Sequence, residues 1–237
     1  MSSRVQLMLN KCYILVQIIH VFCYQGINYV MVSEMRDIRF DLWIISIPTT
    51  WSPLDCSRKC ETNGTCLSFQ YSFLSGQCRL FNTIFLHQDA GVYDIGWQFY
   101  IVSHRRCRDL FIDGRDLDIC FMFAGFHNLT EGKEKCAAMS SGIISITSTE
   151  ENQFLIRLTE PFSNIFLSDS SYKRPFIQGF WDGRNWVLDN GTLLVYTQWA
   201  DGHPKINQDR HYIKFVIGKW KTSISSAIRP VFCSYKL

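Results

Sequence analysis

The sequence has little of what marks nucleic-acid-binding proteins and enzymes. Its formal net charge at pH 7 is only +3, and its basic residues form no long block, so binding driven by phosphate contacts is not expected. It has no GxSxG or HExxH motif and no signature of a nucleophilic cysteine. None of the ten cysteines forms a CxxC pair, which argues against zinc-ribbon and thioredoxin-type motifs. We therefore expect no nucleic-acid partner and no enzymatic activity, and no residue is nominated as catalytic.

Internal repeats and low-complexity segments are also absent, and the 47% apolar content is that of a globular protein. A chain of 237 residues can hold one ordinary domain or two small ones. Ten cysteines without metal-binding spacing indicate a disulfide framework, which persists in an oxidising compartment. The composition therefore predicts a secreted or extracellular protein linked by disulfides.

The N-terminus lacks the long apolar run of a typical membrane span, which needs about 20 predominantly apolar residues. Arg4 and Lys11 precede an uncharged run from Cys12 to Tyr24, which has the length of a secretory signal but contains polar residues. We predict a signal peptide at residues 1–26. The alternative is an uncleaved type II membrane anchor, and in both cases the later residues lie outside the cytosol because the positive charges precede the run.

Two of the ten cysteines lie in this segment, and the remaining eight form two groups. The first group is Cys56, Cys60, Cys66 and Cys78, and the second is Cys107, Cys120, Cys136 and Cys233. Between the groups runs the polar and basic segment Val102–Arg106, which we interpret as a linker. The sequence therefore predicts two domains, at residues 30–103 and 107–237.

The first domain is predicted to hold one helix and several short strands. Ser52-Pro53 begins the helix, which carries Cys56 and Cys60 on one face, and Asn63 ends it. Three aromatic-rich segments read as strands: Leu67–Phe73, Cys78–Phe81 and Trp97–Val102. A domain of about 70 residues buries too little apolar surface to be stable without cross-links. Four cysteines allow three pairings, of which we favour Cys56–Cys78 with Cys60–Cys66.

This region resembles the PAN/apple-like module, also called the CW domain. The resemblance rests on Trp51, the CxxxC of Cys56 and Cys60, Cys66-Leu67, the Cys78–Phe81 stretch and the closing segment Gly96–Ile101. It implies a small α+β fold that binds protein or carbohydrate and has no catalytic role.

The second domain begins with helices and continues with strands. Thr130 is predicted to cap a helix that ends at Ser140-Ser141-Gly142, before a short buried strand at Ile143–Ile146. Thr147–Glu150 has the pattern of a capping box that opens a second helix. Everything from Phe176 onward is predicted to be strand and turn.

This order of elements resembles the long form of the C-type lectin-like domain, an α+β fold with two helices, antiparallel sheets and a long loop. The matching stretches are Cys120–Phe123, Gly132–Leu155, Ile177–Phe180, Trp186–Trp199, Gly218–Trp220 and Val231–Cys233. The resemblance implies disulfides Cys107–Cys120 and Cys136–Cys233. It also places a ligand in the loop after Trp199.

Calcium-dependent members of that family hold the ion with a carboxylate-Pro-Asn triplet and an Asn-Asp pair. This sequence has His203-Pro204-Lys205 and Lys221-Thr222 at those places, and calcium needs six to eight oxygen ligands. We therefore expect no calcium at the usual sugar site, and no other cofactor. The candidate ligand-binding residues of the long loop are His203, Pro204, Lys205, Asp209, Trp220 and Lys221.

Several functions remain open. The first is an extracellular protein-binding module, the second a calcium-independent lectin, and the third a calcium-dependent lectin. Lys205 and Lys221 either face an acidic glycan or acidic protein, or are ordinary solvated lysines. The histidines and aspartates at residues 201–211 have the ligand types of zinc, a less favoured interpretation. Three sequons, at Asn63, Asn128 and Asn190, are expected glycosylation sites in a secreted chain.

Overall fold

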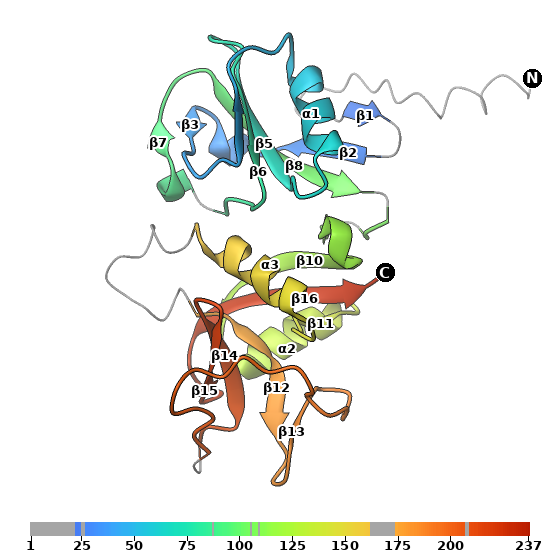
Figure 1. Cartoon of the computed structure of the whole chain (residues 1–237), viewed down its shortest axis with the longest axis vertical. Helices are drawn as coiled ribbons and strands as arrows, with labels where there is room; N and C mark the ends of the chain where they lie inside the picture. The colour runs from blue at the N-terminus through green and yellow to red at the C-terminus, as the bar shows by residue number, and fades with distance from the viewer. Residues whose placement is uncertain are drawn as a thin grey trace, which may run out of the picture. The chain divides into compact units, whose positions relative to one another are not determined.

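The computed structural model describes residues 22–24, 27–86, 88–104, 106–108, 110–161, 174–206 and 209–237. The chain divides into two compact units, Met1–Asp116 and Leu117–Leu237 (Figure 1). Both units mix short helices with antiparallel strands, so the predicted α+β class is confirmed. Within the described residues, no helix is long and apolar enough to span a bilayer.

The boundary between the units falls later than the linker predicted at Val102–Arg106. Strand β8 (Trp97–His104) runs through most of that segment, and His104 pairs with Ile27 of strand β2 (Ile27–Met31). The linker prediction is therefore wrong, because backbone pairing with β2 outweighs the polar composition of the segment. Residues 107–116, which were predicted to open the second domain, belong to the first unit.

The predicted signal segment, residues 1–26, lies mostly outside the described residues. Its described part is strand β1 (Phe22–Tyr24), which pairs antiparallel with β2. Cleavage of this segment stays a prediction.

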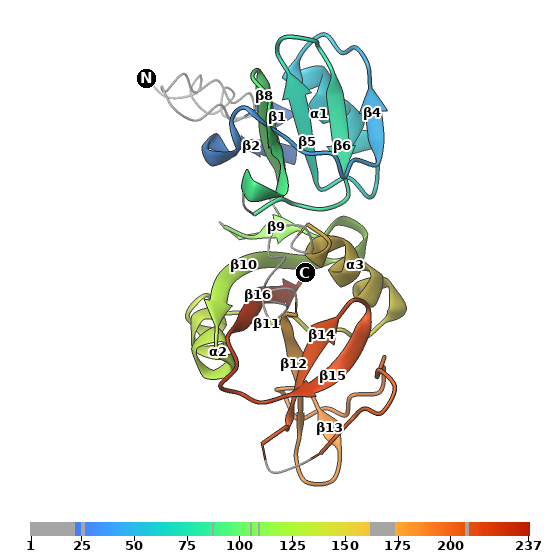
Figure 2. The same cartoon turned by 90° about the vertical axis from the view of Figure 1, so that its left-hand side faces the viewer.

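The first unit is built on a six-stranded sheet in the order β1-β2-β8-β5-β6-β4. Its further elements are η1 (Ser33–Met35), β3 (Ile38–Arg39), β4 (Ile45–Ile47), α1 (Pro53–Thr62), β5 (Ser68–Ser72), β6 (Cys78–Phe81), η2 (Gln88–Ala90), β7 (Val92–Tyr93) and β9 (Ile112–Asp113), and η3 (Arg115–Leu117) follows at the boundary. Helix α1 packs against β5 and β6, behind the strands in Figure 2.

Helix α1 begins and ends as predicted. Ser52 caps its N-terminus by accepting a hydrogen bond from the Asp55 amide, and Pro53 occupies the first helical turn. Cys56 and Cys60 lie fully buried on the inner face of the helix. They form the disulfides Cys56–Cys78 and Cys60–Cys66, the pairing favoured from the sequence. The helix is therefore fixed to β6 and to its own following loop by covalent bonds.

An aromatic cluster fills the core beside β8. The rings of Phe40 and Phe85 are stacked with centroids 3.8 Å apart, and Phe81 and Phe99 contact Phe85 edge-on. The buried amide of Gln70 accepts a hydrogen bond from the Phe40 amide and donates one to the Ile38 carbonyl. This polar link gives the Phe40 amide and the Ile38 carbonyl a hydrogen-bond partner, as burial requires.

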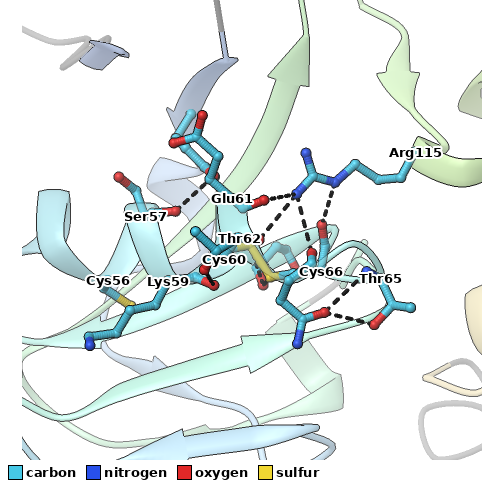
Figure 3. The surroundings of a disulfide bond; sticks show 12 residues. Cys56, Ser57, Lys59, Cys60, Glu61, Thr62, Thr65, Cys66 and Arg115 are labelled. Atoms are coloured by element: carbon cyan, nitrogen blue, oxygen red, sulfur yellow. Dashed lines mark hydrogen bonds between the residues drawn. A yellow bond between two sulfur atoms is a disulfide. The ribbon is translucent and has the colours of Figure 1, made fainter. Parts of the chain in front are cut away.

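Arg115 closes the C-terminal end of α1 (Figure 3). Its Nε donates to the Cys66 carbonyl at 3.1 Å, and one terminal nitrogen donates to the carbonyls of Cys60, Glu61 and Asn63 at 3.1 to 3.4 Å. The last carbonyls of a helix have no partner within the helix, and positive charge is favourable beside them. Asp113 holds Arg115 in place by accepting its backbone amide at 2.8 Å. The guanidinium therefore supplies donors that α1 itself lacks.

The described residues of the second unit form two helices and two sheets. Its elements are β10 (Ile119–His127), α2 (Leu129–Ala138), β11 (Gly142–Ile143), α3 (Thr149–Thr159), β12 (Phe176–Trp181), β13 (Trp186–Val187), β14 (Tyr212–Val216), β15 (Lys219–Ser223) and β16 (Arg229–Lys236). In the first sheet β16 lies between β11 and β10, and the second has the order β13-β12-β14-β15 (Figure 2). The disulfide Cys136–Cys233 joins α2 to β16, as the family resemblance implies. Cys107 and Cys120 are also disulfide-bonded.

Both helices begin one or two residues away from the predicted positions. Asn128, and not Thr130, caps α2, because its side-chain oxygen accepts the Glu131 amide. Ser148, and not Thr147, caps α3 by accepting the Glu151 amide. Asn and Ser are strong capping residues, and each stands at the point where the chain turns from extended to helical.

Glu151 links the start of α3 to the C-terminal strand. Only 7% of its side chain is exposed, and its carboxylate accepts hydrogen bonds from Lys236 and from the amide and hydroxyl of Thr147. Burial raises the pKa of Glu151, but the hydrogen bonds from Lys236 and Thr147 outweigh this effect, so the pKa lies below its ordinary value. The carboxylate is therefore stable in its charged form.

We expect Glu151→Gln to lower the free energy of unfolding by about 1 to 2 kcal/mol at neutral pH, since Lys236 loses its carboxylate partner. Because the pKa is lowered on folding, this contribution is complete above the unfolded-state pKa and disappears as the pH falls through the folded-state pKa. Urea unfolding near pH 7 and near pH 3 should show a difference that shrinks in acid. Glu134→Gln, at an exposed position of α2, is the control, and an equal effect of both variants would contradict the prediction.

Candidate functional site

The candidate site lies in the long loop between β13 and β14, of which the structure describes residues 200–206 and 209–211. The loop begins where Trp199 forms an isolated bridge with Trp220 of β15. The Ala200 amide donates to the Trp220 carbonyl, and the Trp220 amide donates to the Gln198 carbonyl, at 2.9 and 2.7 Å. Strand and turn were predicted from Phe176 onward, but between Val187 and Trp199 the chain is mostly irregular. The backbone hydrogen bonds to β15 and the packing of Trp199 against Trp186 and Trp220 hold its end in place.

Trp220 is part of the core and not of a ligand-binding surface. Its side chain is 0% exposed, and its ring contacts Trp199 and Tyr196 at centroid distances of 5.9 and 5.8 Å. Its indole nitrogen donates to the side-chain oxygen of buried Asn152 at 3.0 Å. The Asn152 amide donates in turn to the Gly218 carbonyl. The prediction that Trp220 contacts a ligand is therefore wrong, because Asn152 of α3 and the rings of Trp199 and Tyr196 cover its side chain.

The fold brings His203 next to Thr222, and so joins the two stretches that the sequence analysis compared with calcium ligands. The backbone amide of Thr222 in β15 donates to Nδ1 of His203 at 3.2 Å, so this ring nitrogen carries no proton. Burial lowers the pKa of His203, and the positive charges of Lys221, Lys205, Lys214 and Arg210 lower it further. The imidazole is therefore neutral. It fills the space beside Thr222 without supplying any charge that would hold a cation.

The remaining long-loop candidates lie around this contact. The His203–Pro204 peptide bond is cis. Pro204, Lys205 and Asp209 are exposed, and Lys221 is half-buried. Among the described residues, no hydrogen bond or ion pair joins the Asp209 carboxylate to Lys205 or Lys221. In the described part of the chain, no group of three His, Cys, Asp or Glu side chains is placed to hold a metal ion.

Lys214 is a neighbour of this site that the sequence analysis did not nominate. It lies in the middle of β14, directly opposite Lys221 of β15. Burial, together with the positive charges of Arg229, Arg174, Arg210 and Lys221, lowers the pKa of Lys214 to about 8. The signal that marks it is the alternation Tyr212–Val216, in which buried Ile213 and Phe215 flank a lysine on the opposite face.

The three predicted glycosylation positions lie in different local structures. Asn63 and Asn190 lie in turns, where each side-chain oxygen accepts hydrogen bonds from the amide and hydroxyl of the threonine two residues later. Asn128 instead uses its side-chain oxygen to cap α2. Glycosylation stays a prediction at all three.

Comparison with known proteins gives one family match and several structural likenesses. The family model of the PAN domain matches residues 39–85. The mouse scavenger receptor C-type lectin carbohydrate-recognition domain is 18% identical over 55% of this chain and 96% of its own, with a TM-score of 0.45. Human lithostathine is 18% identical over 55% of this chain and 91% of its own, with a TM-score of 0.46.

A calcium-independent type II antifreeze protein is 16% identical over 55% of this chain and 94% of its own, with a TM-score of 0.44. A comparison with curated proteins finds no match. Residues 39–85 therefore match the PAN domain, as predicted, and the chain is similar to C-type lectin-like domains over 55% of its length.

Proposed function

We propose that this chain is an extracellular recognition module that binds a glycan or protein ligand through the long loop of its second unit, without calcium. The observation that carries this proposal is the hydrogen bond between the Thr222 amide and the neutral His203 ring. A calcium ion in this place would need carboxylate and amide oxygens. The neighbouring side chains Lys205 and Lys221 are instead cations, which repel a divalent ion.

The two units suit a binding role in different ways. The first unit is held by two disulfides around one helix, and PAN modules are associated with protein or carbohydrate binding. The second offers a long loop tied at its base to a rigid sheet, an arrangement that many binding proteins use for variable contacts. Secretion fits the disulfides, which persist in an oxidising compartment. No residue is assigned a catalytic role.

A glycan array in the presence of a chelator separates the two leading functions. Binding to particular glycans that persists in chelator supports a calcium-independent lectin, whereas the absence of any glycan signal supports a protein-binding module. Binding that appears only when calcium is added would overturn the proposal, because it requires a site made of oxygen ligands.

Thermal unfolding gives an independent test of the calcium prediction. We expect millimolar calcium to leave the melting temperature unchanged, because a ligand stabilises a protein only through binding to the folded state. Magnesium at the same ionic strength is the control for screening of charges. A rise in melting temperature that is specific to calcium would contradict the prediction.

A further inference from the structure

Positive side chains from several elements meet on one face of the sheet β12-β14-β15. Lys214 faces Lys221 across β14 and β15, and it faces Phe176 across β14 and β12. Arg229, the first residue of β16, lies with its guanidinium carbon 5.6 Å from the centre of the Phe176 ring. Its Nε donates to the hydroxyl of Ser223, two residues beyond Lys221, at 3.1 Å. Since alternate strand residues share a face, these cations lie on the same side of the sheet.

This arrangement of charges opposes the stability of the fold. Like charges directly opposite each other destabilise an antiparallel pair. Both lysines are half-buried, and among the described residues no carboxylate forms a hydrogen bond or ion pair with either of them. Burial and the surrounding cations lower the pKa of Lys214 to about 8. The charged form of Lys214 is therefore destabilised in the folded protein, although most of the lysine stays protonated near neutral pH. A cost of this kind is typical of a functional site.

The distribution of the cations favours a ligand with several separated anionic groups. Lys214 and Lys221 form the centre, while Lys205 and Arg210 lie exposed on the long loop and Arg174 precedes β12. A protein partner would instead be expected to find an exposed aromatic anchor at the centre. The aromatic side chains on the lysine-bearing face are Phe176, which is 0% exposed, and Phe180 and Tyr212, which are half-buried, so none of them stands out as an exposed anchor.

We propose that Lys214 and Lys221, together with Lys205, Arg210 and Arg174, bind a sulfated polysaccharide. Charge-assisted hydrogen bonds to sulfate oxygens would replace the missing carboxylates and remove the repulsion between the two opposed lysines. Arg229 does not bind the ligand itself. It positions the neighbouring strands, because it packs on Phe176 of β12 and donates a hydrogen bond to Ser223 of β15. This inference rests on the proposed function, and it names the ligand class of the same region of the molecule.

The test compares three single variants of the full chain: Lys214→Met, Lys221→Met and the control Lys219→Met. Lys219 lies on the same strand and face as Lys221, but it is exposed and faces Val216. The probe is a heparin oligosaccharide, titrated calorimetrically in chelator, with its desulfated form and polyglutamate as comparisons. We expect Lys214→Met and Lys221→Met each to weaken binding by about tenfold or more, and Lys219→Met by less than about threefold.

Stability provides a second readout that a merely structural lysine would not give. Lys214→Met should leave the melting temperature equal or higher, because it removes a repelled charge while keeping the apolar stem. The inference is overturned if the wild type does not bind the sulfated probe, if the two variants behave like the control, or if polyglutamate binds equally well. Binding of another glycan or of a protein in chelator would then leave the proposed function standing. Calcium-dependent binding alone would remove the proposed function itself.

Discussion

Replacing Asn152 by alanine is expected to lower the free energy of unfolding of the second unit by about 3 kcal/mol. Asn152 is 4% exposed, and its amide joins the Trp220 indole to the Gly218 carbonyl. Its removal leaves a buried donor and a buried acceptor without partners, and each costs about 1 to 3 kcal/mol. The truncated side chain also leaves a small cavity.

The measurement is urea unfolding followed by tryptophan fluorescence, with Gln153→Ala as the matched control. Gln153 is the next residue in α3 and is exposed, so its truncation should change stability by no more than about 0.5 kcal/mol. Equal stability of the two variants would show that the Asn152 bridge contributes nothing measurable. The result also bears on the ligand site, because Trp220 anchors the strand that carries Lys221.

Replacing Arg115 by alanine is expected to destabilise the first unit by about 2 to 3 kcal/mol. A charged donor that bonds to buried carbonyls contributes more than a neutral one, and its loss exposes the last turn of α1. Lysine should restore only part of the loss, because one ammonium cannot reproduce the fork of donors that contacts Cys66 and three other carbonyls. Hydrogen exchange of peptides that cover α1 and Cys66 reports the effect locally.

A glycine variant at this position separates the stabilising effect of the Arg115 side chain from the strain in its backbone. Arg115 has a φ of 59°, in the left-handed region that glycine adopts without strain. Arg115→Gly should therefore be more stable than Arg115→Ala, yet less stable than the wild type. If glycine equals or exceeds the wild type, the guanidinium does not stabilise α1 and the interpretation fails.

Local rules predicted the parts of the fold that depend on neighbouring residues. Ser52-Pro53 located the start of α1, because capping and proline at the first turn act within a few residues. The same rules predicted the start of α2 at Thr130, whereas the helix is capped by Asn128. Several capping residues stand close together there, and tertiary packing selects among them. The resemblance to the PAN module was confirmed for residues 39–85.

The candidate site was harder to predict because it depends on contacts between distant segments. The sequence identified His203 and Lys221, but not the hydrogen bond by which β15 holds the histidine. It left Trp220 open between a core aromatic and a ligand contact, because the partner that buries its indole, Asn152, lies 68 residues away. Lys214 was missed because it matters only through its position opposite Lys221. That pairing depends on the strand register, which the sequence alone does not show.

The disulfide between Cys136 and Cys233 makes a closed ring of most of the second unit, since the two residues lie 97 positions apart. Helix α3, the second sheet and the whole long loop are all contained in that ring. A single cut of the backbone anywhere inside it opens the ring but leaves both fragments covalently attached. The long loop can therefore be nicked by a protease without separating the lysine-bearing strands from the helix α2.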